Sequence, residues 1–239
     1  MTGLVVFDCD GTLTMPHQAN PYLLVAKRHG VETDFCNAIK LFENGVISYP
    51  ALVAMELNML KTAGCRTLAD FYGSLPLPAV RPEAKSVIHK LKQHGVHTAL
   101  LSSGLDVLAH AVAREVGISF ENVYCNYLPT DENGGFNYTL VSQLAQNRST
   151  DHPDANCLQH VDKGQSLRHI LAPSFGISLQ QTAYVGNDLW DLSAMSATLQ
   201  NGGKVFYIGD DDYALHTPLF TPVHSLDQIL PRLQLSRNL

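Results

Sequence analysis

The strongest constraint on the fold is the stretch Leu4–Thr14, in which an apolar run is followed at once by Asp8, Asp10 and Gly11. The apolar run is typical of a buried parallel strand. In open α/β sheets, ligands bind beyond the C-terminal ends of such strands, so we expect both aspartates at a binding crevice. Two carboxylates this close repel each other and need a cation or a shared proton between them. A calcium loop is excluded because its glycine belongs at the sixth position and Gly11 is the fourth residue of the motif.

The residues after Thr14 change from a strand pattern to helical patterns. Helices are predicted, without an intervening strand, over about 20–30, 34–45, 48–62 and 68–72, and a proline-containing segment follows at 73–78. Strands and helices then alternate: strands are expected at 96–101, 119–128, 136–141, 182–186 and 205–208, and helices at 82–95, 105–117, 163–175 and 225–233. A hairpin signal lies at 131–135 and a polar loop at 142–159.

This order predicts an α/β fold with a doubly wound parallel sheet and an inserted helical cap. We expect residues 1–14 and 79–239 to form the core domain and residues 15–78 to form the cap. The strands that end at Asp8 and at Gly186 are expected to be neighbours in the sheet, because both must supply ligands to one metal ion.

Composition narrows the range of partners and compartments. The formal net charge of −6 argues against nucleic acid as the main partner. No apolar run is long enough to span a bilayer, and no signal segment precedes the first strand. The five scattered cysteines resemble reduced cytosolic thiols. We therefore expect a cytoplasmic protein without a membrane partner, whose oligomeric state the sequence leaves open.

Polar clusters follow three of the predicted sheet strands, and one lysine accompanies them. They are Asp8 and Asp10; Ser102, Ser103 and Gly104; Asn187, Asp188 and Asp191; and Lys163. Hydroxyl and backbone N–H groups before a helix favour an anion, and a lysine can supply the cation that a phosphate needs. A carboxylate nucleophile that faces a phosphate needs a metal ion to offset the repulsion, and oxygen ligands suit Mg²⁺.

In these motifs the chain resembles the haloacid dehalogenase-like superfamily, in its phosphoserine phosphatase-like branch. Asp8-x-Asp10-Gly11-Thr12 matches the first motif, Ser102 the second, Lys163 the third and Gly186-Asn187-x-x-x-Asp191 the fourth. The resemblance implies that Asp8 is the nucleophile and that Asp10 is the general acid and base. It implies that Ser102, Ser103, Gly104 and Lys163 bind the phosphoryl group. It also implies that Asp8, Asp10, Asn187, Asp188 and Asp191 form the set from which Mg²⁺ takes its ligands.

The sequence departs from the family pattern at three positions. The fourth motif usually begins Gly-Asp, whereas here Asn187 follows the glycine and Asp188 comes one residue later, so either could be the direct ligand. Phosphoserine-specific members have a glutamate that binds the substrate amine, and His17 occupies its position here. They also have an arginine that binds the substrate carboxylate, and Glu56 occupies that position. Both replacements argue against phosphoserine itself. If Glu56 faces the crevice, the pocket is expected to disfavour carboxylate-bearing phosphates and to tolerate neutral or amine-bearing ones; in the alternative, Glu56 faces solvent on its helix.

The resulting hypothesis is a Mg²⁺-dependent phosphatase that hydrolyses a small phosphorylated metabolite through an aspartyl-phosphate. A phosphotransferase or a dehalogenase would use the same nucleophile, although dehalogenases lack the second aspartate that is present here as Asp10. A non-enzymatic binding module with this fold is the remaining alternative, which Asn187 alone supports.

Overall fold

The computed structural model describes residues 1–15, 21–75, 79–127, 130–133, 135–137, 163–209, 219–233 and 235. Their centre is a six-stranded sheet in the order β3-β2-β1-β4-β5-β6, in which every neighbouring pair is parallel. The strands are β1 (Leu4–Phe7), β2 (His97–Leu105), β3 (Val123–Asn126), β4 (Thr182–Gly186), β5 (Lys204–Ile208) and β6 (Thr221–Val223). The predicted sheet is confirmed. Phe7 pairs with Val185, so the strands that lead to Asp8 and Gly186 are neighbours, as expected.

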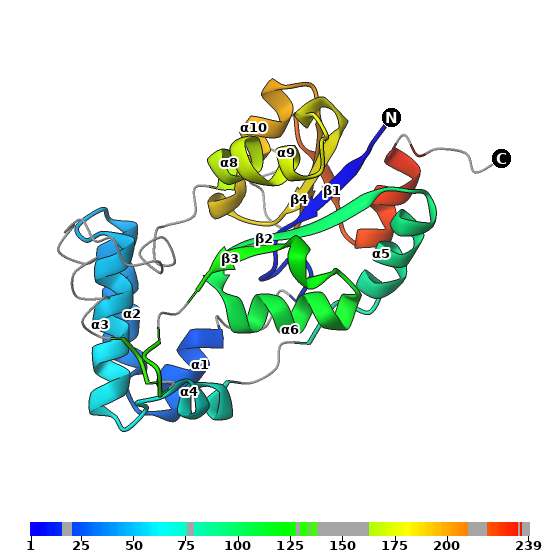
Figure 1. The fold of residues 1–239 in the computed structure, drawn as a ribbon. Coiled ribbons are helices and arrows are strands. Elements are labelled where there is room, and N and C mark those ends of the chain that lie inside the picture. Colours follow the sequence, from blue (N-terminus) through cyan, green and yellow to red (C-terminus); the bar gives the residue numbers. More distant parts are fainter. Residues whose placement is uncertain are drawn as a thin grey trace.

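Helices cover both faces of this sheet because successive side chains of each strand point to opposite sides. Val5 and Phe7 belong to one apolar cluster and Leu4 and Val6 to another, and all four are fully buried. The first cluster packs beneath α5 (Ala84–Gln93), α6 (Asp106–Val116) and the 3₁₀ helix η6 (Leu226–Arg232). The second lies under α8 (Lys163–Ser166), η3 (Leu167–Leu171), α9 (Ala172–Ser174) and α10 (Leu192–Gln200), on the opposite face (Figure 1).

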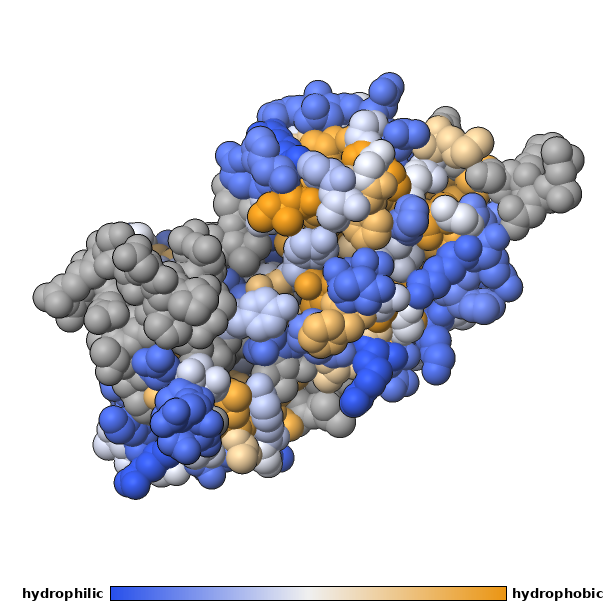
Figure 2. Space-filling model, in the orientation of Figure 1, coloured by the Kyte–Doolittle hydropathy of each residue, from blue (hydrophilic) through white to orange (hydrophobic). Residues whose placement is uncertain are grey.

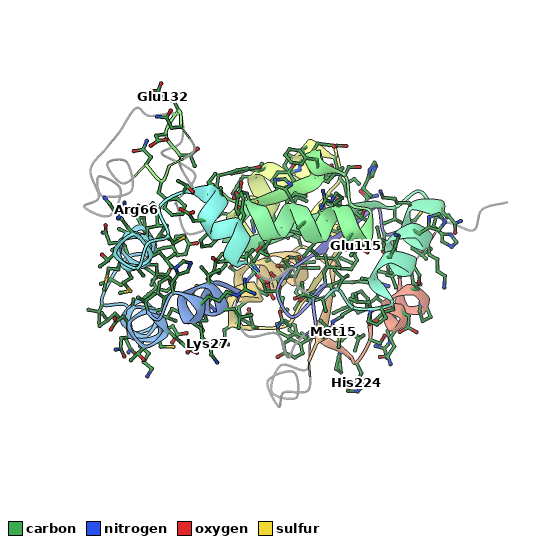
Figure 3. The ribbon with its side chains drawn as sticks, turned by 90° about the horizontal axis from the view of Figure 1, so that it is seen from below. Met15, Lys27, Arg66, Glu115, Glu132 and His224 are labelled. Carbon is green, nitrogen blue, oxygen red and sulfur yellow. The ribbon has the colours of Figure 1, made fainter. Side chains whose placement is uncertain are left out.

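Four helices between β1 and α5 form a lobe beside the sheet, which we call the cap. They are α1 (Pro21–Arg28), α2 (Glu32–Glu43), α3 (Tyr49–Thr62) and α4 (Leu68–Ser74). The cap has an apolar cluster of its own, separate from the two at the sheet, and Phe136 from the later segment 130–137 joins it. Figure 3 shows α2 and α3 nearly end-on, with α1 and α4 between them and the sheet domain. The cap therefore lies beyond the C-terminal ends of the strands, where the polar clusters are expected.

Several elements differ from the sequence-based predictions. The predicted helix 163–175 contains a π-helical stretch, Leu167–Leu171, which ends two residues before Pro173, a residue that has no N–H to donate to the preceding turn. Helix α10 and strand β6 were not predicted; β6 has only three residues and contains Pro222. The last predicted helix is a 3₁₀ helix with Pro231 inside it. The predicted loop 142–159 and most of the predicted strand 136–141 lie outside the described residues.

The face that Figure 2 shows is mixed, with hydrophilic residues over much of the coloured surface and hydrophobic patches mainly on the sheet domain. Of the helices that the structure describes, none is both long and apolar enough to cross a membrane.

Candidate active site

Three charged residues from distant parts of the chain meet at the ends of β1 and β4. Lys163, the first residue of α8, lies with its Nζ 2.5 Å from Asp8 Oδ1 and 2.6 Å from Asp191 Oδ1. All three side chains are buried. Asp191 also accepts hydrogen bonds from the Tyr184 hydroxyl (2.7 Å) and from the Asn187 backbone N–H (2.9 Å). Both oxygens of Asp191 are therefore already engaged by the protein.

The charges in this cluster do not balance among the described residues. Burial and the nearby carboxylate of Asp191 raise the pKa of Asp8 well above its usual range, although Lys163 opposes them. Burial also raises the pKa of Asp10. Burial by itself would lower the pKa of Lys163, but the carboxylates of Asp191 and Asp8 outweigh it and raise that pKa. The ammonium of Lys163 thus lies among several carboxylates. A further positive charge would stabilise the ionised form of Asp8.

The loop after β1 is held in shape by Arg81, which is buried at the return from the cap. Its Nε donates to the Thr12 carbonyl and its Nη2 to the Gly11 carbonyl, both at 2.8 Å. The Gly11 N–H donates to Thr14 Oγ1 at 2.9 Å. Gly11 has φ of +78°, and a β-carbon there would collide with the side-chain amide of Asn187. Only glycine satisfies both conditions at this position.

The structure places Asn187, rather than Asp188, next to the first motif. One terminal atom of the Asn187 amide lies 2.9 Å from the Asp10 carbonyl oxygen, 3.2 Å from Asp8 Oδ2 and 3.0 Å from Thr12 Oγ1. Asp188 instead caps the 3₁₀ helix η5 (Leu189–Asp191), where its Oδ1 accepts from the Trp190 N–H at 2.8 Å. Its side chain is held by this local turn.

The terminal amide atom of Asn187 that faces Asp8 and the Asp10 carbonyl lies where an oxygen ligand of a divalent cation would fit. A Mg²⁺ ion with ligands at 2.0–2.1 Å and octahedral angles separates adjacent oxygens by about 3 Å, close to the spacing of these atoms. When no cation is bound, the amide nitrogen suits the position because the Asp10 carbonyl and Asp8 accept hydrogen bonds. When a cation is bound, the amide oxygen would occupy this position and face the cation as a ligand. Among the described residues no group of three or more His, Cys, Asp or Glu side chains forms a metal cluster, so this set depends on an amide and a backbone carbonyl.

The second motif lies in an irregular end of β2. The register with β3 shifts between Leu101 and Leu105, which re-aims the residues between them. Ser102 is buried, and its Oγ accepts from the Gly104 N–H at 2.9 Å, which leaves the hydroxyl proton available to donate. The Ser103 hydroxyl is buried and has no partner in the part of the chain that the structure describes. The strand is longer than predicted, and the Gly104 N–H, which we expected to be available to an anion, is bonded locally.

Aromatic residues of the cap reach the sheet domain around this cluster. The Tyr49 hydroxyl donates to the Ser103 carbonyl at 3.2 Å. Phe42 stacks on Trp190 with ring centroids 5.4 Å apart and planes at 15°. Trp190, which is 38% exposed, therefore packs between the cap and the sheet domain.

Glu56 occupies the inner face of α3 and is half-buried. It lies seven residues after Tyr49, on the stripe that carries the buried Leu52, Val53 and Leu60. Burial raises the pKa of Glu56 to about 8. Next to burial, the charge of Glu56 is the largest cause that raises the pKa of Tyr49, which places the two side chains near each other. His17, the other substrate-related departure, lies outside the described residues.

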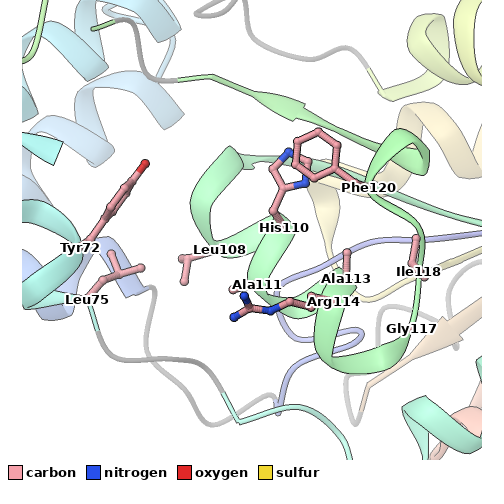
Figure 4. A pocket seen from close by; sticks show the side chains of 10 residues that line it. All are labelled: Tyr72, Leu75, Leu108, His110, Ala111, Ala113, Arg114, Gly117, Ile118 and Phe120. Atoms are coloured by element: carbon pink, nitrogen blue, oxygen red, sulfur yellow. The ribbon is translucent and has the colours of Figure 1, made fainter. Parts of the chain in front are cut away.

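A separate groove of about 920 Å³ lies between α4 and α6 and holds none of the candidate catalytic residues. Figure 4 shows Tyr72 and Leu75 on one side of it and His110 with Phe120 on the other. The groove is lined mainly by apolar side chains, with His110 and Arg114 among them, and it lies apart from the carboxylates and Lys163 of the cluster.

The structure thus brings together most of the residues that the sequence singled out: Asp8, Asp10, Ser102, Gly104, Lys163, Asn187 and Asp191. It adds three that were not assigned to the site. Arg81 and Tyr184 bind backbone or side-chain oxygens of the cluster, and Asn126 donates to the Ser103 carbonyl at 2.7 Å. The sequence reasoning gave neither Arg81 nor Tyr184 a role in the site. The Asp188-x-x-Asp191 spacing is a capping-box signature and could have indicated that Asp188 faces its own helix.

Comparison with known proteins agrees with this architecture. The family model for haloacid dehalogenase-like hydrolases matches residues 5–196, so the chain belongs to that family. A phosphoserine phosphatase of Drosophila melanogaster is 25% identical over 140 residues, which cover 59% of this chain and 50% of that protein. The chain thus matches only half the length of this relative.

Solved structures with the same fold include two of phosphoserine phosphatases. A substrate-bound complex superposes with a TM-score of 0.69 and 17% identity, covering 98% of this chain and 99% of that chain. A phospho-aspartyl intermediate analogue gives 0.67, also at 17% identity, with the same coverage. At this identity the likeness establishes the fold alone.

Proposed function

We propose that the chain is a phosphatase that hydrolyses a small phosphorylated metabolite through an aspartyl-phosphate on Asp8. The observation that carries the proposal is the buried contact of Lys163 with Asp8 at the end of β1, next to the Ser102 hydroxyl and the Asp10 side chain. A fixed ammonium beside a carboxylate can bind a phosphoryl oxygen while the carboxylate attacks phosphorus. Membership of a hydrolase family and the phosphoserine phosphatase relative support the same chemistry.

The residues divide the reaction between them. Asp8 attacks phosphorus, and Asp10, whose pKa burial raises, gives a proton to the leaving alcohol and later takes one from water. Ser102, Ser103 and Lys163 hold the phosphoryl group, while Gly104, whose N–H is bonded to Ser102 Oγ, leaves space for it. Asp191 fixes Lys163 and the loop after β4, since both of its oxygens are occupied. Arg81 holds the Gly11–Thr12 carbonyls so that the two aspartates keep their positions.

Mg²⁺ is the cofactor that we infer for this site, with Asp8, the Asp10 carbonyl and Asn187 as protein ligands. When bound, it would supply the positive charge that lets Asp8 face a phosphate dianion. The support is the spacing of the three oxygen-bearing groups and the excess of carboxylates around Lys163. We also propose that residues 1–14 and 79–239 form the catalytic domain and that residues 15–78 form a cap that selects the substrate.

Release of p-nitrophenol and inorganic phosphate from p-nitrophenyl phosphate tests this function. We expect multiple turnovers with Mg²⁺ and none after chelation, with recovery when Mg²⁺ is restored. Release of halide from 2-haloacids, without phosphate hydrolysis, would instead identify a dehalogenase. A folded chain that binds phosphate but turns over neither substrate would identify a binding module.

The Asn187 site gives a prediction about the metal requirement. Asn187→Asp replaces a neutral oxygen ligand by an anionic one, so the Mg²⁺ concentration for half-maximal activity should fall, by about tenfold for one added charge-assisted contact. Asp188→Ala should leave that concentration within about twofold of the wild type, because Asp188 caps η5 instead. Mg²⁺ titrations of the three proteins decide the point. If Asp188→Ala raised the Mg²⁺ requirement steeply while Asn187→Asp did nothing, Asp188 would be the ligand.

We infer from Glu56 that the substrate does not carry a free carboxylate near the phosphate. Burial raises the pKa of Glu56 to about 8, so an ammonium beside this half-buried carboxyl would favour its ionised form and pair with it, whereas a carboxylate would find no cation there to offset its own charge. Phosphoethanolamine should therefore have a higher kcat/KM than phosphoserine, which carries the same ammonium and an added carboxylate. We expect a preference of at least about tenfold, on the scale of one charge-assisted hydrogen bond.

Glu56→Gln should reduce this preference, whereas Glu32→Gln, on the exposed start of α2, should not. Specificity constants for both substrates in the three proteins provide the measurement. A wild type that prefers phosphoserine, or a preference that Glu56→Gln leaves unchanged, would contradict the assignment of Glu56.

A further inference from the structure

The cap contributes a hydroxyl group to the catalytic crevice. Tyr22 is the second residue of α1, and its ring stacks on Phe71 of α4 with centroids 6.0 Å apart. Phe71 is buried in the apolar cluster of the cap, and Val25 and Ala26 of α1 are fully buried there too. These contacts hold the Tyr22 ring in one place, so its hydroxyl is presented by a rigid part of the cap.

The surroundings of Gly104 locate that hydroxyl. A β-carbon on Gly104 would lie 3.1 Å from Ser102 Oγ, 3.3 Å from the Tyr22 hydroxyl oxygen and 3.4 Å from Asp10 Oδ2. Gly104 does not have a positive φ, so its backbone does not require glycine. Three oxygens, from β2, the loop after β1 and the cap, surround the space above its Cα, and a β-carbon there would crowd them. A side chain at residue 104 would fill the space between the candidate general acid and the candidate phosphate ligand.

We propose that Tyr22 is a catalytic residue supplied by the cap, whose hydroxyl donates a hydrogen bond to a phosphoryl oxygen of the bound ester next to Ser102. The proposal rests on the phosphatase function inferred above. Its chemistry is that of a preorganised donor aimed at the oxygen on which negative charge gathers as phosphoryl transfer proceeds. Since the donor comes from the cap, the full set of phosphoryl contacts exists only when the cap lies over the sheet domain.

Tyr72 provides a matched control within the same aromatic cluster. Its ring also contacts Phe71, at a centroid distance of 6.2 Å, but it lines the groove between α4 and α6, away from the candidate catalytic residues (Figure 4). Tyr22→Phe and Tyr72→Phe each remove one hydroxyl from a ring packed on Phe71. Only the first removes a group near Asp10 and Ser102.

The experiment compares the wild type with the two variants in three measurements: kcat/KM for p-nitrophenyl phosphate, the inhibition constant of orthovanadate, and Tm. Orthovanadate adopts the trigonal bipyramidal shape of the transition state, so its affinity reports donors that act there. We expect Tyr22→Phe to lower kcat/KM about 10- to 100-fold and to weaken vanadate by a similar factor, the scale of one hydrogen bond to a charged oxygen. Tyr72→Phe should stay within about twofold of the wild type, and both variants should keep the Tm.

The outcomes separate this inference from the proposed function. An active wild type, with Tyr22→Phe within twofold of it in both kcat/KM and vanadate inhibition, would overturn the role of Tyr22 and leave the phosphatase function standing. A lowered Tm in Tyr22→Phe with unchanged vanadate affinity would also overturn it, because that pattern belongs to a packing role. A folded wild type that hydrolyses no phosphate ester would instead overturn the proposed function.

Discussion

Asp8→Asn should abolish hydrolysis of every phosphate ester that the wild type accepts. An amide has no anionic oxygen with which to attack phosphorus, and loss of the nucleophile from a covalent mechanism lowers kcat by on the order of 10⁴-fold or more. The fold should be retained, since asparagine has nearly the same shape and burial already disfavours the charge at this position. Lys163 keeps its second partner, Asp191, at 2.6 Å.

The measurement is kcat for p-nitrophenyl phosphate, with circular dichroism and Tm to verify folding. Asp34→Asn, the same change at an exposed position of α2, is the matched control for contaminating phosphatases in the preparation. Hydrolysis in Asp8→Asn above the level that such contamination explains would require a different nucleophile.

Asp10→Asn should produce the second-largest effect, a loss of about 10²–10⁴-fold in the turnover of alkyl phosphates. The substitution removes the acid and base but keeps the backbone carbonyl that faces Asn187. With p-nitrophenyl phosphate, whose leaving group needs no proton, attack by Asp8 should remain fast while the attack of water slows. A stopped-flow trace should therefore show a burst of p-nitrophenol that approaches one equivalent of enzyme, followed by a slow phase. Steady turnover at the wild-type rate without a burst would remove Asp10 from the mechanism.

The sheet and the main charged cluster could be predicted because their causes are local in the sequence. An apolar run that ends in Asp8, and another that ends in Gly186, define two buried parallel strands, and parallel strands end at a common edge. Lys163 could be placed at that edge because it opens the helix before β4. The order of strands and helices then gave the doubly wound sheet and the inserted cap helices.

The rest depends on contacts that only the folded chain creates. Arg81 binds two backbone carbonyls, which carry no sequence signature. Asp188 caps a three-residue 3₁₀ helix, whereas Asn187, one residue earlier, faces the first motif. The packing angle of the cap decides that Trp190 meets Phe42 and that Tyr22 lies above Gly104. Periodicity shows that such aromatic residues belong to a helix face, but not which residues they meet across the crevice.

Identification of the phosphorylated residue tests the central claim most directly. The wild type and Asp10→Asn are mixed with excess p-nitrophenyl phosphate and Mg²⁺, quenched in acid within the burst, digested, and mapped by mass spectrometry. The account predicts one phosphoryl group on the peptide that contains Asp8, more of it in Asp10→Asn than in the wild type, and none in Asp8→Asn. A phosphoryl group on any other residue, or a burst of p-nitrophenol without any phosphorylated peptide, would contradict it.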